Sequence, residues 1–205
     1  MVTNPHPTSA GLSDSEFMRY SRQLMLEDIG PDGQEKLKAA RVLLVGLGGL
    51  GAPASLYLAA AGIGTLLLAD DDALHISNLQ RQILYRTSDT DKPKAVLAQR
   101  QLQALNPNSE AIAITERLSG DALQRAVSCV DLGLDCSDNM TTRHEVNAAC
   151  FSAGKPLISG SAVGFSGQLA VFTPPYHAGC YACLYPDTAE PQRNCRTAGV
   201  LGPVV

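Results

Sequence analysis

The stretch Arg41-Val-Leu-Leu-Val-Gly-Leu-Gly-Gly-Leu-Gly51 decides the fold of this chain. Its first five residues form an apolar run typical of a buried strand, and glycine-rich residues 46–51 precede an Ala/Leu-rich segment. Glycine lets the backbone turn tightly and approach a phosphate, and the N–H groups at a helix start attract anions. Asp70 follows a second apolar run, 19 residues after Gly51, where an acid can accept hydrogen bonds from a ribose. The pattern predicts a nucleotide site, which NAD would satisfy as well as ATP.

The rest of the chain alternates short apolar runs with helical segments of about 10–15 residues. This alternation predicts an α/β, Rossmann-like, three-layer fold: a mainly parallel sheet with helices on both faces and an N-terminal helical extension. Ligands of such sheets bind beyond the carboxyl ends of the strands. The expected strands are 41–45, 65–69, 111–115, 130–135, 156–159 and 169–173. The expected helices are 13–27, 31–40, 49–61, 93–105, 121–128 and 141–153.

Composition narrows the class of protein. Apolar residues make up 45% and charged residues 18% of the 205 residues, which is ordinary for a globular chain. The net charge of -4 lacks the basic surplus that a general nucleic-acid binder needs. No apolar run approaches the roughly 20 residues that span a bilayer, and no signal peptide is apparent, so we expect a cytoplasmic protein without membrane contact. We expect residues 1–12 to be a flexible tail and 13–205 to form one domain.

Polar and cationic residues after the second apolar run separate ATP from NAD. Ser77-Asn-Leu-Gln-Arg-Gln82 is followed by Lys94 at the start of an expected helix. A triphosphate needs cations that offset its charge and stabilise the leaving pyrophosphate, whereas the bridging diphosphate of NAD does not. The alternative is a solvated polar loop, and spacing alone does not decide between them.

Five ordered motifs resemble the ThiF/MoeB/HesA family, bacterial relatives of ubiquitin-activating enzymes. The resemblance covers about residues 14–205. It is nearer to the ThiF branch, which serves thiamine biosynthesis, than to the MoeB branch of molybdopterin biosynthesis. The motifs are residues 17–23 (FMRYSRQ), 46–51 (GLGGLG), 70–72 (DDD), 77–82 (SNLQRQ) with Lys94, and 135–139 (DCSDN).

The resemblance implies roles for the matching residues. Asp70 would hold the ribose, and Asp138 would help to hold Mg²⁺. Arg22 would reach into the site of a partner subunit in a homodimer. The residues expected to bind Mg²⁺-ATP are Gly46, Gly48, Gly49, Gly51, Asp70, Asp72, Ser77, Asn78, Gln80, Arg81, Lys94, Asp138 and Asn139. The residues expected to act in catalysis are Arg22, Arg81, Lys94, Asp138 and Cys195.

The implied activity is ATP-dependent adenylylation of the C-terminal Gly-Gly carboxylate of a ubiquitin-like sulfur carrier protein, with release of pyrophosphate. The nucleophile is already ionised at neutral pH, so no general base is required. Three alternatives stay open: a MoeB-type adenylyltransferase, a non-catalytic family subunit, and an NAD-linked oxidoreductase. Asp138 could also be an ordinary helix cap, and Arg22 a surface charge.

The six cysteines fall into two groups. Cys180-Tyr-Ala-Cys183 has the spacing of a zinc knuckle, and two thiols supply half of a four-ligand structural site. The resemblance places the second pair beyond Val205, so we expect a half-site at which Zn²⁺ is absent or weakly held or the pair is oxidised, with a thioredoxin-like redox role as the alternative. Cys195 lies between two arginines, which favour its thiolate, and the resemblance implies a role in sulfur transfer. The expected small core residues are Cys129, Cys136 and Cys150.

Overall fold

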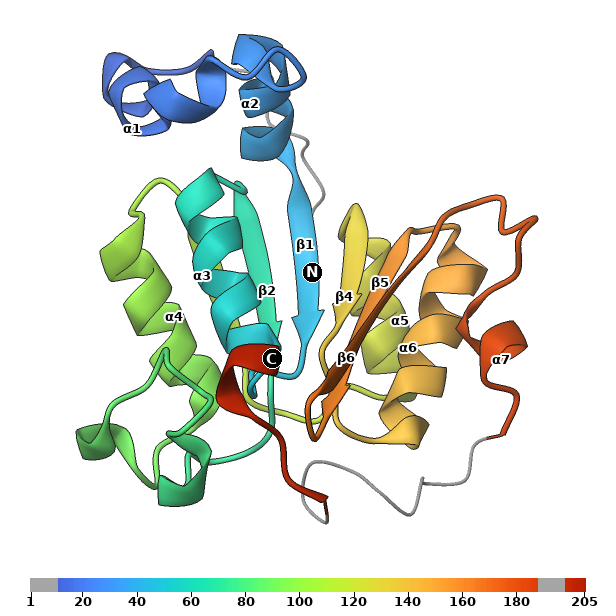
Figure 1. Ribbon diagram of the computed structural model, residues 1–205. Helices are drawn as coiled ribbons and strands as arrows, with labels where there is room; N and C mark the ends of the chain where they lie inside the picture. The colour runs from blue at the N-terminus through green and yellow to red at the C-terminus, as the bar shows by residue number, and fades with distance from the viewer. Residues whose placement is uncertain (1–10, 188–197) are drawn as a thin grey trace.

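The structure, a computed structural model, describes residues 11–187 and 198–205 (Figure 1). Within these residues, six strands form one sheet in the order β3-β2-β1-β4-β5-β6. Neighbouring strands pair in parallel except β5 and β6, which are antiparallel. The strands are β1 Arg41–Val45, β2 Thr65–Ala69, β3 Glu110–Ile114, β4 Leu132–Asp135, β5 Leu157–Val163 and β6 Ser166–Phe172.

The strand order reverses beside β1. The chain builds outward from β1 to β3 on one side, then places β4, β5 and β6 on the other side. In open parallel sheets a ligand crevice forms at this reversal, beyond the carboxyl ends of the strands. The topology therefore puts the expected site between the loops that follow β1 and β4.

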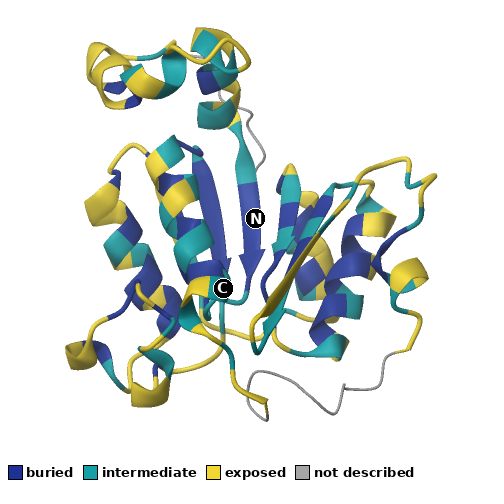
Figure 2. Cartoon of the chain, viewed as in Figure 1, coloured by how far each residue is buried: buried dark blue, intermediate teal, exposed yellow. Residues whose placement is uncertain are grey.

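Helices cover both faces of the sheet (Figure 1). Val42 and Leu44 of β1 point to a core shared with α3 and α4. Leu43 and Val45 point to the opposite core, shared with α5 and α6. Side chains alternate along a strand, so one short apolar strand contributes residues to the hydrophobic cores on both faces of the sheet. Figure 2 shows the central strands as the most buried part of the chain. The helices are α1 Asp14–Leu24, α2 Gly30–Ala39, α3 Gly51–Ala61, α4 Lys94–Leu105, α5 Gly120–Ser128, α6 Met140–Ala153 and α7 Tyr181–Leu184, with 3₁₀ turns at Ile76–Asn78, Thr87–Asp89 and Gly202–Val204.

Helices α1 and α2 form a helical arm at the edge where β1 begins (Figure 1). Fully buried Gln34 donates a hydrogen bond to the carbonyl of Ala61 at 2.9 Å, and Gln23 donates to the same carbonyl at 3.1 Å. Asn106 donates to the carbonyl of Ala59 and to the hydroxyl of Tyr20. The last carbonyls of a helix have no partner within the helix, so these amides cap α3. The same bonds anchor the arm to the end of α3.

The predicted fold class is confirmed, and most expected elements agree with the structure to within about two residues. The first helix ends at Leu24 rather than near residue 27, and β5 continues to Val163 rather than ending at residue 159. Cys136 and Cys150 are buried as expected, whereas Cys129 is only partly buried, because it caps the end of α5 at the surface. No described helix is long and apolar enough to cross a membrane.

Candidate active site

A cavity of about 1290 Å³ opens at the carboxyl ends of the strands. Its walls come from the loops after β1, β2 and β4 and from the β5–β6 hairpin. The structure brings most of the expected ligand-binding residues to these walls. They are Gly46, Gly48, Gly49, Asp70, Asp72, Ser77, Asn78, Arg81, Lys94, Asp138 and Asn139.

Several expected site residues lie elsewhere. Gln80 is exposed and does not line the cavity, and Gly51 is buried against the Gly46 carbonyl and does not line it either. Arg22 lies on α1, at the opposite edge of the sheet from the cavity (Figure 1). Cys180 and Cys183 lie at α7 outside the cavity lining. Cys195 lies outside the described residues.

We call residues 46–51 the glycine loop. Its glycines have two different structural roles. Gly46 has φ +92°, and a Cβ there would lie 2.7 Å from the carbonyl oxygen of Cys136. A Cβ on Gly51 would lie 1.9 Å from the carbonyl oxygen of Gly46. These two glycines permit close packing of the loop, while Gly48 and Gly49 line the cavity. Among the described residues no side chain caps the start of α3, but the Ala52 N–H already donates to the Gly48 carbonyl at 3.0 Å and Pro53 has no N–H, so an anion would meet the N–H groups of the loop itself.

The carboxylate of Asp70 braces the glycine loop. Its Oδ2 accepts a hydrogen bond from the Leu47 N–H at 2.7 Å, and its Oδ1 accepts from the Asp72 N–H at 2.9 Å. Lys94 Nζ lies 3.9 Å from Asp70 and 2.8 Å from Asp72. Burial raises the pKa of Asp70, while Lys94 and the two N–H groups oppose that rise. Asp70 therefore ties β2 to the loop, and its predicted contact with a ribose stays a prediction.

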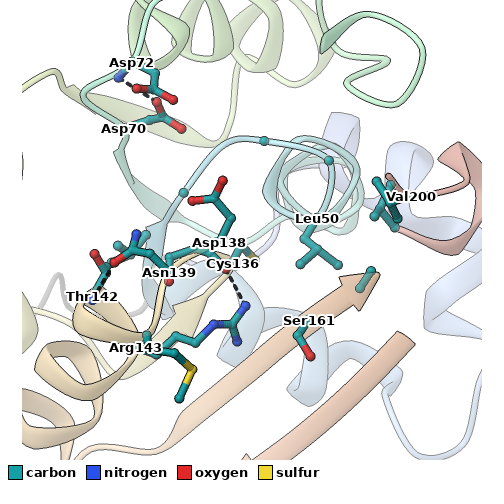
Figure 3. Close-up of a pocket in the computed structure, with 18 of the residues that line it drawn as sticks. Leu50, Asp70, Asp72, Cys136, Asp138, Asn139, Thr142, Arg143, Ser161 and Val200 are labelled. Atoms are coloured by element: carbon teal, nitrogen blue, oxygen red, sulfur yellow. Dashed lines mark hydrogen bonds between the residues drawn. The ribbon is translucent and has the colours of Figure 1, made fainter. Parts of the chain in front are cut away.

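A second braced turn, residues 136–139, carries Asp138 and follows β4. The buried carboxylate of Asp135 accepts hydrogen bonds from the Ser137 N–H at 3.0 Å and from the Ser159 hydroxyl at 2.8 Å. The buried guanidinium of Arg143 donates to the Ser137 carbonyl and lies 3.5 Å from Asp135. Figure 3 shows Arg143 and Asp138 at the middle of the cavity, with Asp70 and Asp72 to one side. A buried ion pair thus fixes the turn that presents Asp138.

Arg81 lies opposite the glycine loop. A Cβ on Gly49 would lie 3.4 Å from Arg81 Cδ, and the guanidinium of Arg81 donates to the Ser77 carbonyl at 3.2 Å. Arg81 and Lys94 bring positive charge to the same cavity as the uncapped helix start. This combination suits a polyphosphate better than the bridging diphosphate of NAD.

The cavity continues over β5 and β6, on the other side of the reversal in strand order. Its walls there include Ser161, Gln168 and the aromatic rings of Tyr181 and Tyr185. The Tyr185 hydroxyl donates to Gln168 Oε1 at 2.8 Å, and the two ring centroids lie 4.9 Å apart. The site therefore has two parts, one beside the glycine loop and one beside the β5–β6 hairpin.

Comparison with known proteins identifies the family. The sequence model of the ThiF family matches residues 20–205. This chain belongs to the ThiF family. A family member, the sulfur carrier protein ThiS adenylyltransferase of Escherichia coli, is 60% identical over 194 residues, which are 95% of this chain and 77% of that protein. The molybdopterin-synthase adenylyltransferase of Salmonella typhimurium is 44% identical over 196 residues, covering 96% of this chain and 79% of that protein.

Solved structures share the fold of this ThiF-family chain. Escherichia coli MccB with ATP has a TM-score of 0.73 and 26% identity, over 93% of this chain. PaaA has a TM-score of 0.75 and 25% identity, over 98% of this chain. The chain spans 61% of that MccB chain and 66% of PaaA, so it corresponds to somewhat under two thirds of either.

Sequence reasoning missed several residues of this ThiF-family cavity. Arg143 follows Asn139 by one helical turn, so helical spacing from the Asp138 turn could have indicated it. Gln82 belongs to the SNLQRQ motif, but the two glutamines of that motif are indistinguishable by type. Residues of the β5–β6 hairpin carry no motif that would single them out. The missed lining residues include Gln82, Glu116, Arg117, Ser137, Thr142, Arg143, Ser161, Gln168, Tyr181 and Tyr185.

The two α7 cysteines do come together. Their Sγ atoms lie 3.8 Å apart, and Asn147 Nδ2 donates to Cys180 Sγ at 3.5 Å. Burial opposes ionisation of Cys180, but the hydrogen bonds from Asn147 and from Cys183 leave its pKa lowered. Across residues 11–187 and 198–205, no third His, Cys, Asp or Glu joins the pair. Two thiols do not fill a tetrahedral zinc site, so the described residues alone do not fit structural zinc.

Proposed function

We propose that this chain uses ATP and Mg²⁺ to attach AMP to the C-terminal Gly-Gly carboxylate of a ubiquitin-like sulfur carrier protein, releasing pyrophosphate. The observation that carries the proposal is the convergence of the glycine loop, Arg81, Lys94 and Asp138 on one cavity. The 60% identity to a ThiS adenylyltransferase supports the same reaction.

ATP would occupy the part of the cavity beside the glycine loop. Its phosphates would lie against Gly48 and Gly49, within reach of the Arg81 guanidinium, because both glycines and Arg81 line the cavity. Lys94 would approach the phosphates from the start of α4. MccB, which shares this fold, has a crystal structure with ATP, and this supports ATP as the ligand.

The carrier tail would enter the part beside the β5–β6 hairpin. Its terminal carboxylate would attack the α-phosphorus of ATP, forming an O–P bond as the bond between that phosphorus and the bridging oxygen breaks. Pyrophosphate leaves with the electron pair, and no proton moves. The chain's work is to align the two substrates and to offset charge on the phosphates. A two-part cavity at a reversal of strand order supports this arrangement.

Asp138 is the residue that we propose for Mg²⁺. Carboxylate oxygen is the ligand that Mg²⁺ prefers, and Asp138 lines the cavity on a turn held by buried hydrogen bonds. Mg²⁺ bound there would neutralise phosphate charge. The turn of residues 136–139 would keep the carboxylate at a fixed distance from the glycine loop, because Gly46 packs against Cys136.

We also propose that the chain acts as a homodimer in which Arg22 serves the partner's cavity. Its position on α1, at the far edge of the sheet, separates it from the cavity of its own chain (Figure 1). Exposed apolar side chains beside it on the helical arm, Met18 and Phe17, support an interface there.

The cysteine proposals concern residues at or beyond the edge of the described chain. Cys180 and Cys183 would supply two of four ligands to Zn²⁺, with the other two from outside the described residues. Cys195 would take part in sulfur transfer after adenylylation. The Sγ separation of 3.8 Å in the first pair supports joint ligation.

For the pathway, we propose thiamine biosynthesis, with the molybdopterin-synthase reaction as the second candidate. The identities of 60% and 44% to the two kinds of adenylyltransferase favour the first. Both carriers can be tried with the same protein, so relative activity decides between them.

The test is carrier-dependent exchange of labelled pyrophosphate into ATP. With Mg²⁺ and Escherichia coli ThiS, we expect exchange that disappears when the terminal carboxylate of ThiS is amidated. Arg81→Ala and Asp138→Ala should lose exchange while keeping their thermal unfolding midpoints. ATP binding without exchange for any Gly-Gly carrier would instead indicate a non-catalytic subunit.

A further inference from the structure

Gln82 occupies a position in the cavity that the motif did not distinguish. Its side chain is 3% exposed and lines the cavity, while Gln80, two residues earlier, is exposed and does not. Gln82 Nε2 lies 3.4 Å from the point where a Cβ on Gly48 would stand. The carboxamide of Gln82 therefore lies directly against the glycine loop.

The carboxamide of Gln82 is also unsatisfied. Its Oε1 is buried and has no hydrogen-bond partner among the described residues. Within residues 11–187 and 198–205, two other buried side-chain atoms share this state, on His144 and Glu145, and neither residue lines the cavity. Among the described residues that line the cavity, only Gln82 therefore has a buried polar atom without a hydrogen-bond partner.

A buried polar atom without a partner costs free energy, and an apolar side chain of the same shape would avoid that cost. An unpaired buried polar atom in a native protein requires an explanation, such as a role in the site or a bound water or ion that supplies the partner. The terminal torsion of glutamine is soft, so the carboxamide can turn within the cavity at little cost. Position, burial and lack of a partner all indicate a ligand contact rather than a packing role.

The neighbours of Gln82 indicate which part of a ligand it meets. A Cβ on Gly48 would meet Gln82 Nε2 at 3.4 Å, whereas a Cβ on Gly49 would meet Val205 at 3.0 Å and Arg81 Cδ at 3.4 Å, so Gln82 and Arg81 both lie beside the glycine loop. The start of α3 follows those glycines, and the positive end of its dipole favours an anion there. A ligand group in the cavity beside this loop would lie near backbone N–H groups, the Gln82 carboxamide and the Arg81 side chain, all of which belong to the cavity wall. Phosphate oxygens, as acceptors, match these donors.

We propose that the Gln82 carboxamide binds the polyphosphate of Mg²⁺-ATP, with Nε2 donating to a phosphate oxygen held at Gly48. Its Oε1 then accepts from a water of the hydrated Mg²⁺, which keeps several waters when bound to nucleotides. The inference rests on the proposed function, since it assigns Gln82 to the nucleotide of that reaction.

The inference predicts that one variant, Gln82→Leu, keeps or gains thermal stability but loses affinity for ATP. Gln82→Leu removes the orphaned atom, so the unliganded protein should unfold at the same temperature as the wild type or higher. The same change removes the ligand contact, so the Kd for ATP with Mg²⁺ should rise about tenfold or more. A residue with a packing role would show the reverse: lower stability and unchanged binding.

The experiment measures nucleotide binding by titration calorimetry and unfolding by calorimetry, without a carrier. Gln103→Leu, on the exposed face of α4, is the matched control and should change neither quantity. Gln82→Glu keeps the shape of the side chain and adds a negative charge beside the phosphates, so it should weaken ATP binding further. It also keeps the question answerable if Gln82→Leu fails to fold.

AMP provides the second arm, because it lacks the β- and γ-phosphates. We expect Gln82→Leu to weaken ATP far more than AMP. An equal loss for both nucleotides, or wild-type ATP binding in both Gln82 variants, would overturn the assignment. If the wild-type protein binds ATP but never exchanges pyrophosphate, the proposed function is wrong. The role of Gln82 is still decided by the binding measurements alone.

Discussion

Arg143 and Asp135 form an ion pair at 3.5 Å in which both side chains are buried, below the turn that presents Asp138. The pair joins the start of α6 to the end of β4, on the β4 side of the reversal in strand order. Removing two charges from water costs free energy, so an intact buried ion pair adds little net stability, and its main effect can be to hold the local backbone in one conformation. Here the pair holds the turn of residues 136–139, which carries Asp138.

Removal of one member of this pair should be strongly destabilising. Arg143→Met leaves the Asp135 carboxylate buried without its cation, so we expect a loss of about 3–5 kcal/mol in the free energy of unfolding. Urea unfolding at neutral pH measures this loss. Arg125→Met, an exposed arginine on α5, is the control and should stay within about 0.5 kcal/mol. A loss for Arg143→Met no larger than the control would contradict the structural role of the pair.

The glycines of the loop should separate into two groups on substitution by alanine. Gly46→Ala and Gly51→Ala force backbone contacts of 2.7 and 1.9 Å, so both should lower the unfolding temperature and the amount of folded protein. Gly48→Ala meets only the end of Gln82, at 3.4 Å, so it should fold normally and raise the KM for ATP. Thermal unfolding and ATP–pyrophosphate exchange distinguish these outcomes. Equal destabilisation in all three variants would contradict the assignment.

Asp89 should contribute to the loss of stability in acid. The hydrogen bond from Arg100, 2.8 Å long, lowers the pKa of Asp89 below its ordinary 3.8, against the opposing effect of burial. A carboxyl with a lowered folded pKa adds stability above its unfolded pKa, and this is lost as pH falls through the folded pKa. Between about pH 5 and pH 2, wild-type stability should therefore fall more steeply than that of Asp89→Asn. Urea midpoints across this range provide the measurement, and parallel curves would refute the prediction.

The cysteines should differ sharply in reactivity. Burial and the nearby Asp135 carboxylate raise the pKa of Cys136 to about 12 and that of Cys150 to about 11. Both should remain thiols and resist iodoacetamide at neutral pH, because the thiolate is the nucleophile. Exposed Cys183 should react in chelator-treated protein. Peptide mass spectrometry reads each site, and labelling of Cys136 before Cys183 would be the contrary result.

The fold could be predicted from the sequence because its signals are local. Residues 41–45 and 65–69 are continuous apolar runs, and the structure gives β1 and β2 these same bounds. Glycine marks the end of α3, where Gly62 adopts the left-handed conformation. The end of β5 was missed because its last residues, up to Val163, are held by pairing with β6, which is a tertiary interaction.

The site was predictable in part for the same reason. Residues that follow strands β1, β2 and β4 could be placed at one edge of the sheet from topology alone. The SNLQRQ motif contains two glutamines, and only one of them faces that edge. The choice depends on the backbone hydrogen bonds of the turn from Asn78 to Tyr85, which cannot be read from the sequence. The hairpin wall of the cavity, with Gln168 and Tyr185, depends on contacts between distant segments.

Helix α3 joins two regions that substitution studies would treat as unrelated. Its first residue, Gly51, ends the glycine loop that lines the cavity, and the carbonyl of its last residue, Ala61, accepts hydrogen bonds from Gln23 and Gln34 of the helical arm. At 1.5 Å per residue, its 11 residues make a rod about 16 Å long. A substitution that tilts this helix would move the glycine loop and the helical arm together, so if the proposed nucleotide site and dimer interface are correct, loss of nucleotide binding and loss of dimerisation should occur in the same variant.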